Sequence, residues 1–129
     1  MFDSNAPPSS DAYLNILRET IVGEVRLDKD LTLRQLAVLL TVYQANEPQT
    51  VRGLAAHLEV NKPAITRALD LLGKHGLVRR DWDPADLRSV RTQRTSNGTA
   101  MMKRLAASMA SASAKAAAMP REVPGNPAE

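Results

Sequence analysis

The most constraining feature of the sequence is the segment Val60–Asp70, which reads VNKPAITRALD. Asn61 is a favoured helix N-cap, because its side-chain oxygen can accept a hydrogen bond from a free N–H group of the first turn. Pro63 suits an early helical position, where a missing N–H costs nothing. Apolar residues then recur at helical spacing and predict a buried stripe of Ile65, Ala68, Leu69 and Leu72. We therefore expect a helix over residues 62–75.

The opposite face of this predicted helix carries Lys62, Thr66 and Arg67, with the small Ala64 beside them. The positive end of a helix and its free N–H groups attract phosphate, and Thr and Arg side chains can reach base edges. Such a face suits the major groove of DNA. An ordinary solvated helix face is the alternative, so the neighbouring segments must decide between the two.

A second short helix is predicted immediately before this one, over residues 51–58. Thr50 is placed to cap it, and Arg52 is expected to face outward. Only Glu59-Val60 separates this helix from the cap at Asn61. Two short helices joined so closely, the second basic at its start, predict a helix-turn-helix.

A longer helix is predicted ahead of this pair, ending near Asn46. Thr32-x-x-Gln35 matches a capping box at its start. Its apolar residues lie on most faces, so we expect it to be the most buried element. They are Leu33, Leu36, Ala37, Leu39, Leu40 and Tyr43.

A basic β-hairpin is predicted after the helix-turn-helix, beyond a left-handed C-cap at Gly76. Residues 77–81 and 89–94 read as strands, and the run Asp83-Pro84-Ala85-Asp86 reads as a turn. We expect a tip of about six residues with Arg88 near its end, placed to enter a minor groove narrowed by A·T pairs. The flanking arginines would contact phosphates; they are Arg79, Arg80 and Arg91. A solvated edge hairpin that uses charge against aggregation is the alternative.

An amphipathic helix is predicted at the start of the chain, capped by Ser10 or Asp11 and ending near Arg26. Its polar residues are expected to face away from the core; they are Arg18, Glu19 and Glu24. Its apolar stripe is Leu14, Leu17, Ile21 and Val25, with Tyr13 beside it. A stripe this narrow needs a partner, which is either the domain or a second copy of the chain.

A last helix is predicted over residues 96–118, capped by Thr95 or Ser96 and rich in Ala and Ser. Met101, Met102 and Leu105 lie along one side, and the rest offers little bulk. We therefore expect one domain over 11–119. It would comprise a DNA-binding core at 31–95 and flanking dimerisation helices within 11–30 and 96–119, with disordered ends at 1–10 and 120–129.

Composition limits the class of protein. The 129 residues are 43% hydrophobic and contain no cysteine, which excludes disulfides and thiolate chemistry. No apolar run approaches the ~20 residues of a membrane span, and residues 1–10 lack the features of a signal peptide. No catalytic set, phosphate-cradling loop or metal cluster is visible, and His57 and His75 have no second ligand at metal spacing. We therefore expect a cytoplasmic protein that is not an enzyme and holds neither metal nor cofactor.

The charge is unevenly distributed along the chain. The formal net charge of +3 combines −3 over residues 1–60, +6 over residues 61–104 and zero over residues 105–129. The positive excess thus falls on the predicted second helix of the helix-turn-helix and on the hairpin. Such clustering is the electrostatic pattern of a nucleic-acid-binding protein.

Four motifs identify a family. They are LTLRQLAVLL at 31–40, VRGLAAHLEVNKPAITRALDLL at 51–72, GLVRR at 76–80 and DPADLRSV at 83–90. With them, residues 31–105 resemble the MarR family of bacterial winged-helix transcription regulators. The chain departs from that family at Thr92 and Arg94, where relatives usually have apolar side chains, and in having one C-terminal helix where relatives have two.

The resemblance implies a homodimer, formed here through helices 11–26 and 96–118, on a pseudo-palindromic operator. Segment 61–67 would enter the major groove, Arg88 would reach the minor groove, and Asp86 would order the wing. Many members respond to small phenolic or hydrophobic effectors, whereas thiol sensing is excluded here by the lack of cysteine. A bacterial protein of this kind would lie in the cytoplasm, associated with the nucleoid.

The expected fold class is therefore mainly α with a small β-hairpin wing (α+β), a winged helix-turn-helix with flanking helices. The expected function is that of a sequence-specific regulator of transcription, repressor-like and dimeric, that reads double-stranded DNA with helix 62–75 and wing 79–94. Its predicted DNA-binding residues are Arg52, Asn61, Lys62, Ala64, Thr66, Arg67, Arg79, Arg80, Arg88, Ser89 and Arg91. The alternative is a winged-helix adaptor or co-regulator with weak or no specific DNA binding, which would not need the basic excess.

Overall fold

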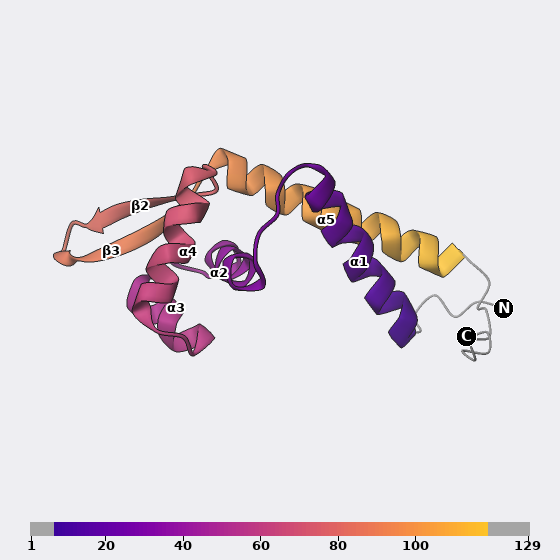
Figure 1. The fold of residues 1–129 in the computed structure, drawn as a ribbon, viewed down its shortest axis with the longest axis horizontal. Helices are drawn as coiled ribbons and strands as arrows, with labels where there is room; N and C mark the ends of the chain where they lie inside the picture. Colours follow the sequence, from indigo (N-terminus) through magenta and orange to yellow (C-terminus); the bar gives the residue numbers. More distant parts are fainter. Residues whose placement is uncertain (1–6, 119–129) are drawn as a thin grey trace. The chain divides into compact units, whose positions relative to one another are not determined.

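The computed structural model describes residues 7–118, without the side chains of residues 87–89 (Figure 1). Its elements in chain order are α1 (Ser10–Arg26), α2 (Leu33–Gln44), β1 (Gln49–Thr50), α3 (Val51–Leu58), α4 (Lys62–Lys74), β2 (Val78–Asp83), β3 (Asp86–Arg94) and α5 (Ser96–Ala118). Residues 30–104 form one compact unit, and residues up to 29 together with those from 105 onward form another. The predicted fold class, helices with a small β wing, is confirmed. Most of the ends predicted to be disordered lie outside the described residues, but Ser10 is helical and Ser9 caps α1.

The core of the 30–104 unit is built on α4. This helix buries Ala64, Ile65, Ala68, Leu69 and Leu72, whereas α2 buries only Val38, Leu39 and Val42. The expectation that α2 would be the most buried element is therefore wrong. Leu33 at its start is exposed, because the covered face of α2 is a single stripe spaced by three or four residues. The predicted capping box between Thr32 and Gln35 is confirmed, and α2 ends at Gln44, short of Asn46.

A three-stranded antiparallel sheet completes this unit, in the order β1-β3-β2. The sequence pattern does not predict β1, since of its two residues only Thr50 is interpreted, as the cap of α3. The predicted six-residue tip of the wing is wrong: Asp83 pairs with Asp86, and only Pro84 and Ala85 lie between them. Arg88 is therefore part of β3 rather than of a loop. The register of the two strands shifts between Trp82 and Asp83, where β3 has three more residues than β2.

The side chain of Tyr43 joins α2 to the base of the wing, where β2 begins and β3 ends. Its hydroxyl group donates a hydrogen bond to the carbonyl of Leu77 at 2.6 Å and accepts one from the N–H of Thr95 at 3.0 Å. Gly98, in the first turn of α5, makes room for this arrangement, since a Cβ there would overlap the Tyr43 hydroxyl and the Leu77 carbonyl. The glycine is thus required by close approach rather than by an unusual backbone conformation.

The second unit contains α1 and the part of α5 from Leu105 onward. In α1 the buried residues are Ile16, Thr20 and Glu24, spaced by one helical turn. The expected apolar stripe is not covered within the single chain, because Leu14, Leu17 and Val25 are exposed. Glu24 is buried, so the expectation that it faces away is wrong. Within a single chain, the covered stripe of α1 is therefore the one that contains Thr20, and the bulkier apolar side chains of the helix stay exposed. On α5, Ala112 is buried and Met109 is exposed.

Replacement of Gly98 by alanine should destabilise the protein although alanine favours helices. Alanine gains about 1 kcal/mol of helix propensity, but its methyl group would displace Tyr43 and leave buried polar groups unpaired, at about 1–3 kcal/mol each. We expect a net loss in the free energy of unfolding, measured by urea denaturation. Ala100→Gly, at an exposed position of the same helix, is the control and should cost only the propensity difference. A Gly98→Ala protein as stable as the wild type would contradict the observed packing.

Candidate nucleic-acid interface

The N-terminal turn of α4 presents the predicted reading face. The Asn61 side-chain oxygen accepts a hydrogen bond from the Ala64 N–H at 2.8 Å, and Pro63 lies in the first turn, so the predicted cap is confirmed. Lys62 and Arg67 are exposed, and Thr66 is half-buried between them. These side chains stand on a helix whose opposite face is fixed in the core. The arrangement offers a charged group, a hydroxyl group and a guanidinium group at one helix end.

Ala64 does not belong to this exposed face. It is only 5% exposed and packs with the buried stripe. The cap at Asn61 sets the helix phase so that position 64 is one turn before Ala68, on the covered side. The prediction that Ala64 lies among the outward residues is therefore wrong, and its small size serves the packing of α4.

The turn between α3 and α4 has a geometry that the sequence pattern does not predict. Glu59 adopts a left-handed conformation with φ 57°, and the Val60 N–H donates to the Ala55 carbonyl at 3.1 Å. This closes α3 within three residues of the start of α4, as a helix-turn-helix requires. Arg52 lies on the first turn of α3 and is exposed, as predicted.

Three arginines predicted to contact phosphates each have a carboxylate partner within the chain. Arg79 lies 3.1 Å from Asp81, and Arg91 lies 3.8 Å from Asp83. Arg80 pairs with Asp70, which joins β2 to α4. The side chains of Arg88 and Ser89 lie outside the described residues. Arg79, Arg80 and Arg91 are thus brought to the wing, but as members of ion pairs.

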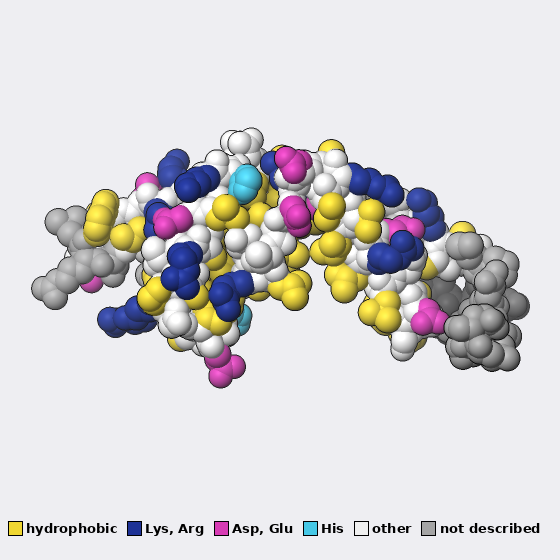
Figure 2. Space-filling view, viewed as in Figure 1, with side chains coloured by type: hydrophobic (Ala, Val, Ile, Leu, Met, Phe, Trp, Pro, Cys, Tyr) yellow, Lys and Arg dark blue, Asp and Glu magenta, His cyan; other side chains and the backbone are white. Residues whose placement is uncertain are grey.

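Asp70 is a residue of this surface that the sequence reading missed. It is an exposed acidic residue three positions after Arg67, on the outer side of α4. An acidic residue at that position would repel a phosphate unless a cation neutralised it. An acid on a face expected to meet DNA therefore predicts a cationic partner, and that partner is Arg80. Figure 2 shows Lys and Arg side chains around α4 and the base of the wing, with acidic side chains among them.

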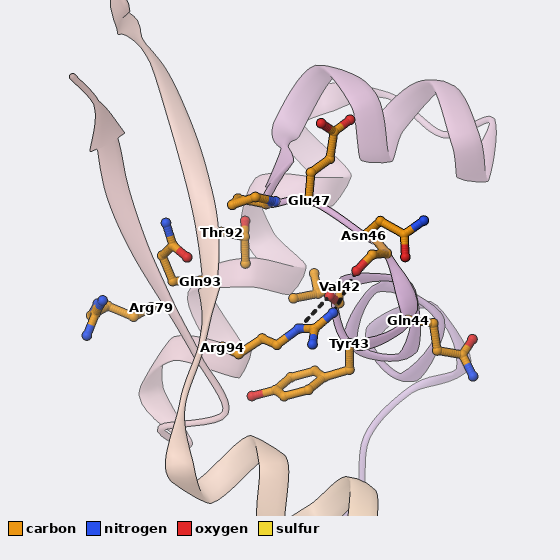
Figure 3. A pocket seen from close by; sticks show the side chains of 11 residues that line it. Val42, Tyr43, Gln44, Asn46, Glu47, Arg79, Thr92, Gln93 and Arg94 are labelled. Carbon is orange, nitrogen blue, oxygen red and sulfur yellow. Dashed lines mark hydrogen bonds between the residues drawn. The ribbon is translucent and has the colours of Figure 1, made fainter. Parts of the chain in front are cut away.

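The departures at Thr92 and Arg94 lie beside an open pocket of about 610 Å³ (Figure 3). Thr92 is 2% exposed, and its hydroxyl group has no hydrogen-bond partner among the described residues, which weakens the inward face of β3. Arg94 has another use, since its guanidinium group donates to the carbonyls of Val42 and Ala45 at the end of α2. Arg94 and Tyr43 line the pocket together.

Other kinds of site are not found in the described part of the chain. Between residues 7 and 118, no three His, Cys, Asp or Glu side chains form a group that could hold a metal ion. No helix in that range has both the length and the apolar character needed to cross a bilayer.

The chain is similar to known proteins in sequence and in fold. A sequence model of the MarR family matches residues 31–90. The transcriptional regulator Tm0710 from Thermotoga maritima is 26% identical with a TM-score of 0.66, over 82% of this chain and 78% of its own. CouR from Rhodococcus jostii RHA1, bound to p-coumaroyl-CoA, is 25% identical with a TM-score of 0.60, over 82% and 73%. A mutant of MepR from S. aureus, bound to an oligodeoxyribonucleotide, is 18% identical with a TM-score of 0.73, over 88% and 86%. No curated protein sequence matches the chain.

The match of residues 31–90 to this family model confirms, for the winged helix, the resemblance suggested by the motifs. The likeness to MepR, at 18% identity, supports the fold alone. What these relatives bind is a property of those proteins.

The ion pair between Arg80 and Asp70 should contribute little to stability. Both side chains are partly exposed, at 35% and 48%, and exposed pairs are typically worth 0–1 kcal/mol. We expect a double-mutant cycle with Arg80→Ala and Asp70→Ala, measured by urea denaturation, to give a coupling free energy below about 1 kcal/mol. A coupling of about 3 kcal/mol would mean that Arg80 is committed to the fold and is not available to phosphate.

Proposed function

We propose that the protein is a DNA-binding regulator of transcription that recognises a specific duplex site. The observation that carries the proposal is the face of α4 formed by Lys62, Thr66 and Arg67, which is held outward by the burial of the opposite face. The net charge of +6 over residues 61–104 supports a polyanionic partner. The match of residues 31–90 to the MarR family model also supports it, and MepR, which shares the fold, is bound to an oligodeoxyribonucleotide in its solved structure.

In the proposed complex, α4 enters the major groove by its N-terminal turn. Thr66 and Arg67 would read base edges, with good bidentate contacts worth about 1–3 kcal/mol each. The Asn61 oxygen is already used by the helix cap, so only its amide N–H groups would be available to bases. Lys62 and Arg52 would bind phosphates, which supply most of the affinity and its salt dependence.

The wing is proposed to contact the flanking minor groove. Arg88 is the residue assigned to that groove, and Ser89 would bind the backbone beside it. The ion-paired arginines of the wing would have to exchange a carboxylate for a phosphate. Because exposed ion pairs are weak, that exchange costs little, and Arg79 has the most exposed side chain of the three, at 65%.

We propose that the regulator is a homodimer formed through α1 and α5. Exposed apolar side chains on α1 and at its C-cap support a second copy of the chain as their partner; they are Tyr13, Leu14, Leu17 and Val25, with Leu27 at the cap. A twofold dimer would place two copies of α4 on a pseudo-palindromic site. A dimer bound at a promoter would block transcription, so we propose a repressor-like role, exerted at the nucleoid.

We include a small-molecule effector among the proposed partners. The support is CouR, whose structure holds p-coumaroyl-CoA. A ligand that binds the free protein and the DNA-bound protein with different affinities would change the affinity of the protein for DNA by the same factor.

The assignment of Arg67 to base reading predicts a loss of specificity. Arg67→Ala should weaken binding to the cognate duplex by about 1–3 kcal/mol more than binding to random duplex, measured by fluorescence anisotropy. Arg52→Ala is the matched control, because loss of a phosphate contact should weaken both duplexes alike and lower the salt slope by about 1. Equal losses on both duplexes for Arg67→Ala would make it a phosphate contact. A wild-type protein that shows no preference between duplexes would favour the alternative function, a winged-helix adaptor or co-regulator.

The assignment of α1 to the dimer predicts that Leu17→Glu is monomeric. Leu17 is 53% exposed in the single chain, so the substitution should leave the monomer folded while placing a charge in the proposed interface. Light scattering after size exclusion should give twice the 14.0 kDa chain mass for the wild type and once that mass for the variant. Leu33→Glu makes the same change at an exposed leucine of α2 and should stay dimeric. A monomeric wild type would refute the proposed dimer.

A further inference from the structure

We propose that Arg94 and Tyr43 form a junction that sets the direction of the wing, and that Arg94 is a positioning residue for DNA binding. The inference rests on the proposed function only for its effect on DNA; the effect on the wing itself can be measured in the free protein. The junction is formed by the end of α2, the start of β2 and the end of β3.

Arg94 holds the end of β3 against the C-terminus of α2. Its Nε donates to the Val42 carbonyl at 3.3 Å, and its Nη2 donates to the Ala45 carbonyl at 2.6 Å (Figure 3). The last carbonyls of a helix lack intrahelical partners and form its negative end. A guanidinium group satisfies two of them at once and is attracted by the helix dipole. The group also lies over the Tyr43 ring, 5.7 Å from its centroid.

Tyr43 holds the other side of the same junction. Its hydroxyl group bonds the carbonyl of Leu77, the residue before β2, and the N–H of Thr95, the residue after β3. One side chain of α2 therefore fixes the roots of both wing strands. Arg94 and Tyr43 are stacked on each other, so displacement of either would loosen the other.

Apart from this junction, the pair of Arg80 with Asp70 joins β2 to α4, and that pair is partly exposed and therefore weak. The third strand, β1, pairs with β3 only at Thr92 and Arg91, and beyond that point the wing is a two-stranded ribbon, which is marginally stable by itself. Six residues of β2 extend about 20 Å at ~3.3 Å per residue. A rotation of ~10° at the root would move the tip by about 3 Å, roughly the rise of one base pair. The junction thus decides which base step the wing reaches.

An apolar residue at position 94 could pack on Tyr43 but could not bond the carbonyls of Val42 and Ala45. This difference separates positioning from simple core packing. Arg94→Leu removes the hydrogen bonds and the charge, Arg94→Lys keeps the charge without the planar fork, and Tyr43→Phe removes a hydroxyl group and no charge. Arg34→Leu is the matched control, since it removes one exposed cation from α2.

The first readout is amide hydrogen exchange in the free full-length protein. We expect Arg94→Leu and Tyr43→Phe to speed exchange in β2 and β3 by about tenfold, as expected for loss of one or two hydrogen bonds, while α4 stays as protected as in the wild type. Arg94→Lys should fall between Arg94→Leu and the wild type, and Arg34→Leu should match the wild type. The single tryptophan, Trp82 on β2, is 62% exposed and should show lower steady-state fluorescence anisotropy in the two loosened variants.

The second readout is affinity for the cognate duplex. Both junction variants should bind roughly five- to tenfold more weakly and lose preference for A·T flanks, because the wing no longer rests in one groove position. Unchanged exchange in β2 and β3, or equal acceleration in α4, would overturn the proposal. If the wild type binds its site specifically, junction variants that exchange faster in the wing but keep the wild-type affinity for DNA would also overturn the proposal. A wild type without specific binding would refute the proposed function, and the exchange data would still decide whether the junction exists.

Discussion

Burial of one face of α4 is the interaction on which the winged helix depends. Ile65, Leu69 and Leu72 are fully buried, and each such side chain contributes about 1.5–3 kcal/mol. Their packing fixes the rotation of the helix about its axis, so that Lys62 and Arg67 must point outward. The same burial that holds the fold together therefore aims the residues proposed to read DNA.

The features predicted correctly from the sequence are those encoded within a few residues. Asn61 caps α4, Thr32 and Gln35 form their capping box, and Gly76 takes a positive φ of 69°. Each depends on a side chain bonding its own backbone or on glycine's conformational freedom, and no distant residue is needed.

The features predicted wrongly depend on contacts between distant segments. Whether Glu24 of α1 faces away or is buried is decided by the surface that packs against the helix. Pairing of Asp83 with Asp86 depends on a shift of register between Trp82 and Asp83, which the turn residues do not predict. The hydrogen bonds of Arg94 join residues about fifty positions apart, so their acceptors cannot be predicted from the local sequence. An arginine at that place in the strand pattern indicates only that the inward face of β3 is unusual. Arg80 and Asp70 are a similar case, because pairing across two elements is invisible to periodicity.

The charge pattern of the wing has a consequence for recognition. Arg79, Arg80 and Arg91 are each paired with a carboxylate in the free protein, so these three arginines contribute less free positive charge than the composition of the wing suggests. Affinity for arbitrary DNA would then come mainly from α4 and α3, and a wing held by Arg94 and Tyr43 would add contacts only where the groove fits it. Partial neutralisation of this kind favours specificity over raw affinity.

The most direct measurement is fluorescence anisotropy of the full-length protein with genomic duplexes across a range of salt, including the DNA upstream of its own gene. Specific regulation predicts one tight fragment, a salt slope of several phosphate contacts and roughly 10³-fold preference over random duplex. Weak binding to all fragments, lost near physiological salt, would contradict it.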